Sequence, residues 1–154
     1  TTSYIRYTKS MRNNINRIHN LEKAFVFYMN TMYDWNLNWT GEGMSNWDAE
    51  GSTSKGNKCV VEMKFRKTYY ETKMIEVFKY DKLMSLDKDI VKLYFVSDPK
   101  GSYMFYLNEL NDLSKESLSC PKNTMWNGAK TNKDVYLLSE DKAIMKQQFN
   151  TKLF

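Results

Sequence analysis

The sequence predicts an α/β (α+β) domain in which helices flank a central mixed β-sheet. Three observations support this prediction: a helical stripe of apolar residues near the N-terminus, an apolar run of strand type at 59–66, and a strand pair around a turn at 98–101. Helix, strands, helix and strand pair in this order are typical of a layered domain. The 154 residues fit one domain that spans 1–154.

The first element is predicted to be a long helix at about 10–33. Its apolar residues recur at spacings of three and four, which marks one helical face: Met11, Ile15, Ile18, Phe25, Met29 and Met32. Glu22 takes the missing step of that stripe, on the side expected to be buried. A buried carboxylate is unfavourable unless a partner compensates for its lost hydration, so Glu22 is expected to have a functional or structural partner.

The next elements are an irregular first strand ending near Asp48, a hairpin turn at 51–57 and a strand at 59–66. The turn is indicated by its Gly, Ser and Asn residues. The strand reads Cys-Val-Val-Glu-Met-Lys-Phe-Arg. Its apolar start and alternating end suit a central strand whose far end emerges into a site.

The second half is expected to contain a helix, a strand pair, a short strand and a C-terminal helix. The helix is expected at 74–86, and the strands at 92–97, 103–107 and 135–138. Ser139 is the predicted N-cap of the C-terminal helix, because Glu140 and Asp141 follow it in the first turn.

Composition bears on compartment and partners. The net charge of +5 and the pI near 9.0 are compatible with an anionic partner. Cys59 and Cys120 lack a C-x-x-C pattern and a nearby His, so buried thiols in a reducing compartment are expected. No stretch reaches membrane-spanning length. We therefore expect a cytoplasmic protein with no membrane partner, and the Lys, Asn and Tyr bias is typical of a phage or low-GC bacterial gene.

The pattern with the clearest chemical meaning is Asp48, a hairpin, and then Glu62-Met63-Lys64. Residues two apart in a strand face the same way, and Asp48 reaches the same point if its strand pairs alongside. Two carboxylates can share Mg²⁺ or Mn²⁺, which prefer oxygen ligands. Lys64 can then orient a water or neutralise developing charge, and Glu22 can supply a further acid. An E-x-K triplet alone is common on solvated strands, so the prediction depends on the combination.

These residues resemble the PD-(D/E)XK nuclease superfamily over roughly 15–107, including the small members that are Holliday-junction-resolvase-like. The resemblance implies a restriction-endonuclease-like fold. It also implies that Asp48 and Glu62, often with the first-helix Glu22, hold one or two Mg²⁺ ions while Lys64 assists the attacking water. A homodimer is expected by the same resemblance.

Two departures affect the first acidic position. Trp47 stands where the family often has Pro. Asp34, Glu42 and Glu50 are alternatives to Asp48, so the sequence leaves that position open.

Basic residues close to the motif form a candidate nucleic-acid-binding rim: Arg66, Lys67, Lys73, Lys79 and Lys82. They either bind phosphates or form an ordinary solvated face. His19 is the only histidine, which argues against a histidine-based metal nuclease.

Three functions are therefore compared. The leading one is a divalent-metal-dependent endonuclease that hydrolyses DNA, although the sequence does not separate DNA from RNA. The second is a catalytically silent protein of the same fold that binds nucleic acid or a protein. The third is a small structural or inhibitory phage protein, which predicts no salt-dependent binding to DNA.

Overall fold

The computed structural model describes residues 2–121 and 130–149. The helices are α1 (Thr2–Tyr33) and α2 (Val77–Met84), with short 3₁₀ turns η1 (Leu107–Glu109) and η2 (Glu140–Lys142). The strands are β1 (Asn36–Trp39), β2 (Ala49–Ser52), β3 (Lys58–Phe65), β4 (Thr72–Glu76), β5 (Val91–Asp98), β6 (Gly101–Tyr106), β7 (Ser114–Pro121), β8 (Lys130–Ser139) and β9 (Met145–Gln148).

A mixed six-stranded sheet forms the centre of the molecule, in the order β1-β2-β3-β5-β6-β9. Within the described residues, β3 and β5 are its one parallel pair, and Glu62 lies opposite Tyr94 in that register. The chain crosses from β3 to β5 through β4 and α2. The predicted class, a mixed sheet flanked by helices, is confirmed.

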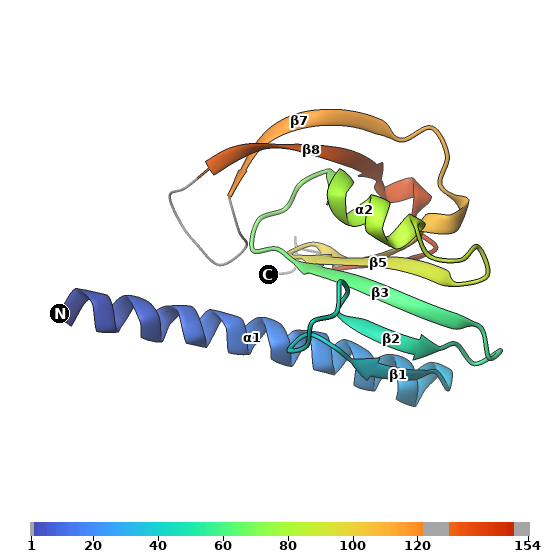
Figure 1. Cartoon of the computed structure of the whole chain (residues 1–154), viewed down its shortest axis with the longest axis horizontal. Helices are drawn as coiled ribbons and strands as arrows, with labels where there is room; N and C mark the ends of the chain where they lie inside the picture. The colour runs from blue at the N-terminus through green and yellow to red at the C-terminus, as the bar shows by residue number, and fades with distance from the viewer. Residues whose placement is uncertain (1, 122–129, 150–154) are drawn as a thin grey trace.

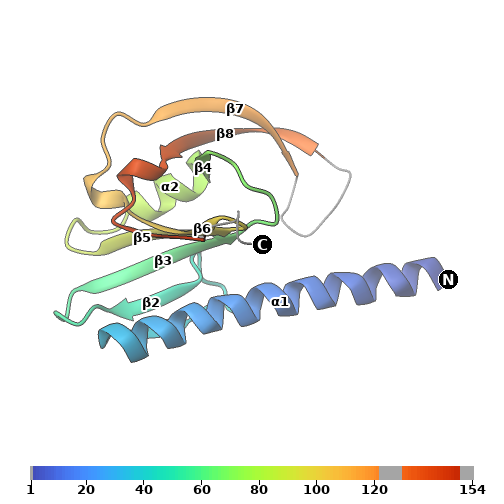
Figure 2. The same ribbon diagram turned by 180° about the vertical axis from the view of Figure 1, so that it is seen from behind.

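The remaining strands form a small antiparallel sheet in the order β4-β8-β7. Figures 1 and 2 show three layers: α1 below the main sheet, the sheet itself, and above it α2 with the small sheet. None of the helices in the described part of the chain combines the length and apolar character that crossing a membrane requires.

Alternate residues of β3 supply the two halves of the core. Cys59 and Val61 pack in the cluster between the sheet and α1, whereas Val60 packs in the cluster between the sheet and α2 with the small sheet. Because side chains alternate along a strand, Glu62 and Lys64 belong to the second face. The site therefore lies beside the apolar core rather than on an open sheet surface.

Several element boundaries differ from the predictions. The first helix begins at Thr2 rather than near residue 10, and residues 72–76 form β4 rather than the start of a helix. The helix prediction at 74–76 was wrong because Lys73 and Ile75 alternate inward along a strand that pairs with β8. The expected C-terminal helix is one 3₁₀ turn, capped by the Ser139 side chain as predicted, followed by β9.

Candidate active site

The start of β2 and the end of β3 bring Asp48 and Glu62 together. The backbone N–H of Asp48 donates to the Val61 carbonyl at 3.0 Å, and its Oδ2 accepts from the Met63 N–H at 2.8 Å. Glu62 and Lys64 leave β3 on one face, and Glu62 is buried. The strand pairing thus fixes the backbone of all the motif residues and one carboxylate oxygen.

Glu22 joins this group from α1. It is 5% exposed, and its Oε1 accepts a hydrogen bond from the indole Nε1 of Trp39 at 2.9 Å. The lysine side chain of Lys23 lies over the same indole, 4.4 Å from the ring centroid. The expectation that Glu22 is buried with a partner is confirmed, and the partner is an indole at the end of β1.

The charge of Asp48 raises the proton affinity of both Glu62 and Glu22. Burial and then the charge of Asp48 raise the pKa of Glu62 to about 7, and the same two causes raise the pKa of Glu22 to about 7. Burial also raises the pKa of Asp48, against the opposing hydrogen bond from Met63. Buried carboxylates with such shifts are typical of functional sites, since a bound cation would stabilise all three.

Two lysines occupy the other side of the site. Burial, with the charges of Arg66 and Lys79, lowers the pKa of Lys64 to about 8. Lys79 reaches over from α2, and its ammonium donates to Glu62 Oε1 at 2.6 Å. Burial opposes the charge of Lys79, yet the pairing with Glu62 raises its pKa. Both lysines are therefore cations at neutral pH, and Lys64 is the one that loses its proton more readily.

The donor set suits a hard divalent ion because all three candidates present carboxylate oxygens. Within the described residues, no group of three or more His, Cys, Asp or Glu side chains converges closely enough to hold a metal ion. The ammonium of Lys79 instead neutralises Glu62. A metal held by Asp48, Glu62 and Glu22 would thus have to take the place of that ammonium and draw the carboxylates together.

The alternatives for the first acidic position lie elsewhere. Asp34, Glu42 and Glu50 are all exposed, and the side chain of Glu50 accepts from Trp47 Nε1 at 2.7 Å. Asp48 is the one whose charge acts on Glu62. The geometry therefore favours Asp48 as the partner of Glu62.

Four of the five rim residues differ in their depth and partners. Arg66 is half-buried and Lys67 is exposed. Lys79 is paired with Glu62, and Lys82 donates to Asn46 Oδ1 at 3.2 Å. Only part of this rim is thus oriented toward solvent.

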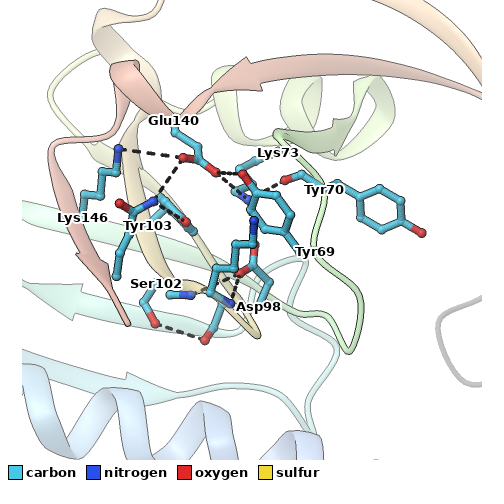
Figure 3. A network of polar contacts seen from close by, with 12 residues as sticks. Tyr69, Tyr70, Lys73, Asp98, Ser102, Tyr103, Glu140 and Lys146 are labelled. Atoms are coloured by element: carbon cyan, nitrogen blue, oxygen red, sulfur yellow. Dashed lines mark hydrogen bonds and ion pairs between the residues drawn. The ribbon is translucent and has the colours of Figure 1, made fainter. Parts of the chain in front are cut away.

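Lys73 is not on the surface but inside a second polar cluster (Figure 3). It is 2% exposed, and its ammonium contacts Asp98 Oδ2 at 2.7 Å, the Tyr70 carbonyl at 2.6 Å and Glu140 Oε1 at 3.1 Å. A buried lysine whose ammonium already has three acceptors is not available to a phosphate. Lys73 therefore does not belong to the candidate nucleic-acid-binding rim.

Sequence reasoning missed the role of Trp39 in holding Glu22 and the direct contact of Lys79 with Glu62. The sequence did contain a signal for the Trp39 contact, because the N–H of an indole that packs against a helix needs a hydrogen-bond acceptor. The second depends on how α2 lies over β3, which no local pattern reports.

Comparisons with known proteins do not assign this chain. No protein-family model, no curated protein and no solved structure was found to match it.

Proposed function

We propose that this protein is a divalent-metal-dependent endonuclease of the PD-(D/E)XK type that hydrolyses phosphodiester bonds of DNA. The observation that supports it best is the meeting of Asp48, Glu62 and Lys64 at the β2–β3 junction, with Glu22 added from α1. Proteins rarely bury several carboxylates side by side without a compensating cation. A central mixed sheet flanked by helices is also what the family resemblance implies.

Each residue has a role that its surroundings support. Asp48 and Glu62 would hold the metal ion, with Glu22 kept in place by the Trp39 hydrogen bond. The ion would lower the pKa of a bound water and stabilise charge on a phosphoryl oxygen. Lys64, with its pKa near 8, can accept a proton from the attacking water or donate a hydrogen bond near neutral pH.

The experiment is a cleavage assay on linear duplex, single-stranded and branched DNA with Mg²⁺ or Mn²⁺. We expect Glu62→Gln and Lys64→Met to abolish cutting. Glu50→Gln is the matched control, because it removes a carboxylate from the neighbouring strand that is exposed. Cutting that persists in Glu62→Gln would show that this site is not catalytic.

The Lys79 contact favours a second candidate, a catalytically silent protein of the same fold that binds nucleic acid. An ammonium 2.6 Å from Glu62 Oε1 neutralises the site without any metal. Calorimetric titration with Mn²⁺ separates the two. A nuclease should bind the ion, and Glu62→Gln should weaken that binding, whereas a silent protein should bind none.

A further inference from the structure

The N-terminal part of α1 extends beyond the main sheet, as Figures 1 and 2 both show. We call residues 2–21 the α1 arm. Phe25 and Met29, beyond the arm, are buried in the core, whereas none of the side chains described at 12–21 is buried. Twenty helical residues span about 30 Å. At 12–21 the helix thus presents a surface that the described residues leave unburied.

The arm is strongly basic. It carries Arg6, Lys9, Arg12 and Arg17, which are four of the 23 Lys and Arg residues, and none of the 18 Asp and Glu residues. It therefore supplies four of the five net positive charges of the chain. The remaining residues are close to neutral overall, so the net positive charge of this protein is concentrated in one element.

One face of the arm combines arginine with asparagine. At 100° per residue, positions 12, 13, 16, 17 and 20 fall on one side of the helix, opposite Glu22 and Phe25. These positions are occupied by Arg12, Asn13, Asn16, Arg17 and Asn20, all exposed. Arginine binds phosphates and guanine edges, and asparagine binds adenine edges, from a helix in the major groove.

We propose that this face of the α1 arm binds duplex DNA, with the helix along the major groove and its arginines on phosphates and base edges. The proposal deepens the proposed function and rests on it for the identity of the substrate. The arm also ends at the candidate active site: the His19 ring lies 5.0 Å from that of Trp39, the residue that holds Glu22.

Charge and composition favour DNA over other occupants. A second copy of the arm would place like charges together, which opposes self-association through this face. An anionic membrane would need large apolar side chains to insert, and the face at 12–20 offers Arg and Asn instead. Duplex RNA has a major groove too deep and narrow for a helix.

The test measures binding to a fluorescent duplex by anisotropy in EDTA, so that cleavage plays no part. The variant is Arg12→Gln with Arg17→Gln. The matched control is Lys55→Gln with Lys58→Gln, which removes the same charge from exposed residues at the β2–β3 end of the sheet, far from the arm (Figure 1). Gln keeps helix propensity, and circular dichroism checks that both variants fold.

We expect the arm variant to bind duplex DNA at least about tenfold more weakly near 0.1 M salt, with a salt slope reduced by about 2, because each lost phosphate contact contributes about 0.9. The control should change affinity by less than about twofold. Equal losses in both variants, no loss in either, or tighter binding to an RNA duplex of the same sequence would overturn the proposal.

Binding by the wild type to phosphatidylserine vesicles but not to DNA would overturn it as well. The failure of the nuclease proposal is separable from these outcomes. The catalytic assignment fails if the Glu62→Gln variant cuts DNA normally, or if the wild type does not cut at all. If arm-dependent DNA binding persists in that case, the proposal for the arm still holds.

Discussion

At the scale of single residues, the candidate site is an arrangement of charges that oppose one another. Glu62 is buried next to Asp48, and Lys79 compensates for only part of the resulting repulsion. Such a site is less stable than an apolar one of the same shape, which is expected where function rather than stability determines the residue type.

The pH dependence of stability tests this directly. The folded pKa of Glu62 is raised from 4.5 to about 7, so the folded state binds this proton more tightly than the unfolded state does. Stability should therefore fall as pH rises from about 4.5 to about 7, by up to roughly 3 kcal/mol from this one group. The stability of the Glu62→Gln variant should fall less over the same pH range. Urea denaturation in EDTA at several pH values measures both proteins. Parallel curves for both proteins would contradict the raised pKa.

Lys79 should compete with a divalent ion for Glu62. Replacing Lys79 by Met removes the ammonium at 2.6 Å, and we expect Mn²⁺ to bind roughly tenfold more tightly, a change of about 1.4 kcal/mol. Lys82→Met, on the same helix but bonded to Asn46, is the control and should leave the affinity unchanged. Calorimetry without nucleic acid provides the measurement, and weaker binding in Lys79→Met would mean that Lys79 supports the metal rather than excludes it.

At the scale of elements, the loop after β1 holds the Glu22–Trp39 pair in place through close packing at Gly41. A Cβ at Gly41 would lie 2.6 Å from Trp39 Nε1 and 2.7 Å from Glu22 Oε1. Gly41→Ala should therefore displace the indole, lower the free energy of unfolding by about 1 to 3 kcal/mol and change the tryptophan fluorescence. Gly43→Ala is the control, because its Cβ would meet nothing closer than 3.6 Å. Equal effects of the two substitutions would refute this account of the loop.

The small sheet is joined to the main sheet by the Lys73 cluster shown in Figure 3. Lys73 leaves β4 and pairs with Asp98 at the end of β5, both nearly inaccessible to solvent. Removing one partner leaves a buried charge, so Lys73→Met should cost about 3 to 5 kcal/mol. Adding Asp98→Asn, which keeps the Oδ1 acceptor for the turn N–H groups, should restore part of that loss.

The control for this cluster is Lys115→Met, which breaks an exposed ion pair with Asp134 and should change stability by no more than about 0.5 kcal/mol. Thermal and urea unfolding supply the comparison. A Lys73→Met protein as stable as Lys115→Met would mean that the two sheets are held together by apolar packing alone.

The elements that the sequence predicted well are those with a local pattern. The apolar run of β3, the Asp98 turn and the long helical stripe all carry their own signal, and each was found close to its expected place. The small sheet was missed, because β4 is read as the start of a helix from 74 onward and β7 has no apolar alternation. Both β4 and β7 become strands because they pair with β8. Such pairing depends on contacts distant in sequence.

The same distinction applies to the site. Asp48, Glu62 and Lys64 were predicted from a spacing within one hairpin, and Glu22 from a break in a helical stripe. The contacts of Lys79 and the burial of Lys73 depend on how α2 and β4 lie over the main sheet. The sequence placed Lys73 and Lys79 together in one candidate phosphate-binding rim, although Lys79 contacts Glu62 and Lys73 lies in the core.

At the scale of the whole molecule, positive charge and candidate chemistry are separated but adjacent. Asp48 and Glu62 lie at the β2–β3 junction and Glu22 on α1, and a protein that cuts DNA would have to hold a polyanion against them. On our proposal, the α1 arm would supply that attraction from outside the core, where its charges do not lower the stability of the three layers. Electrostatic attraction of this kind raises association rates and is weakened by salt.

The contrast between the unburied part of α1 and the part packed on the sheet predicts a gradient of stability along this helix. An isolated helix is marginal in water, so amides at 12–18, where no described side chain is buried, should exchange with deuterium much faster than those at 25–33, which pack on the sheet. Duplex DNA should slow exchange at 12–18 and leave 25–33 unchanged, as followed by mass spectrometry of peptides. Protection at 12–18 that rises with protein concentration without DNA would instead show that two copies associate through the arm, because only a second-order contact depends on concentration in this way.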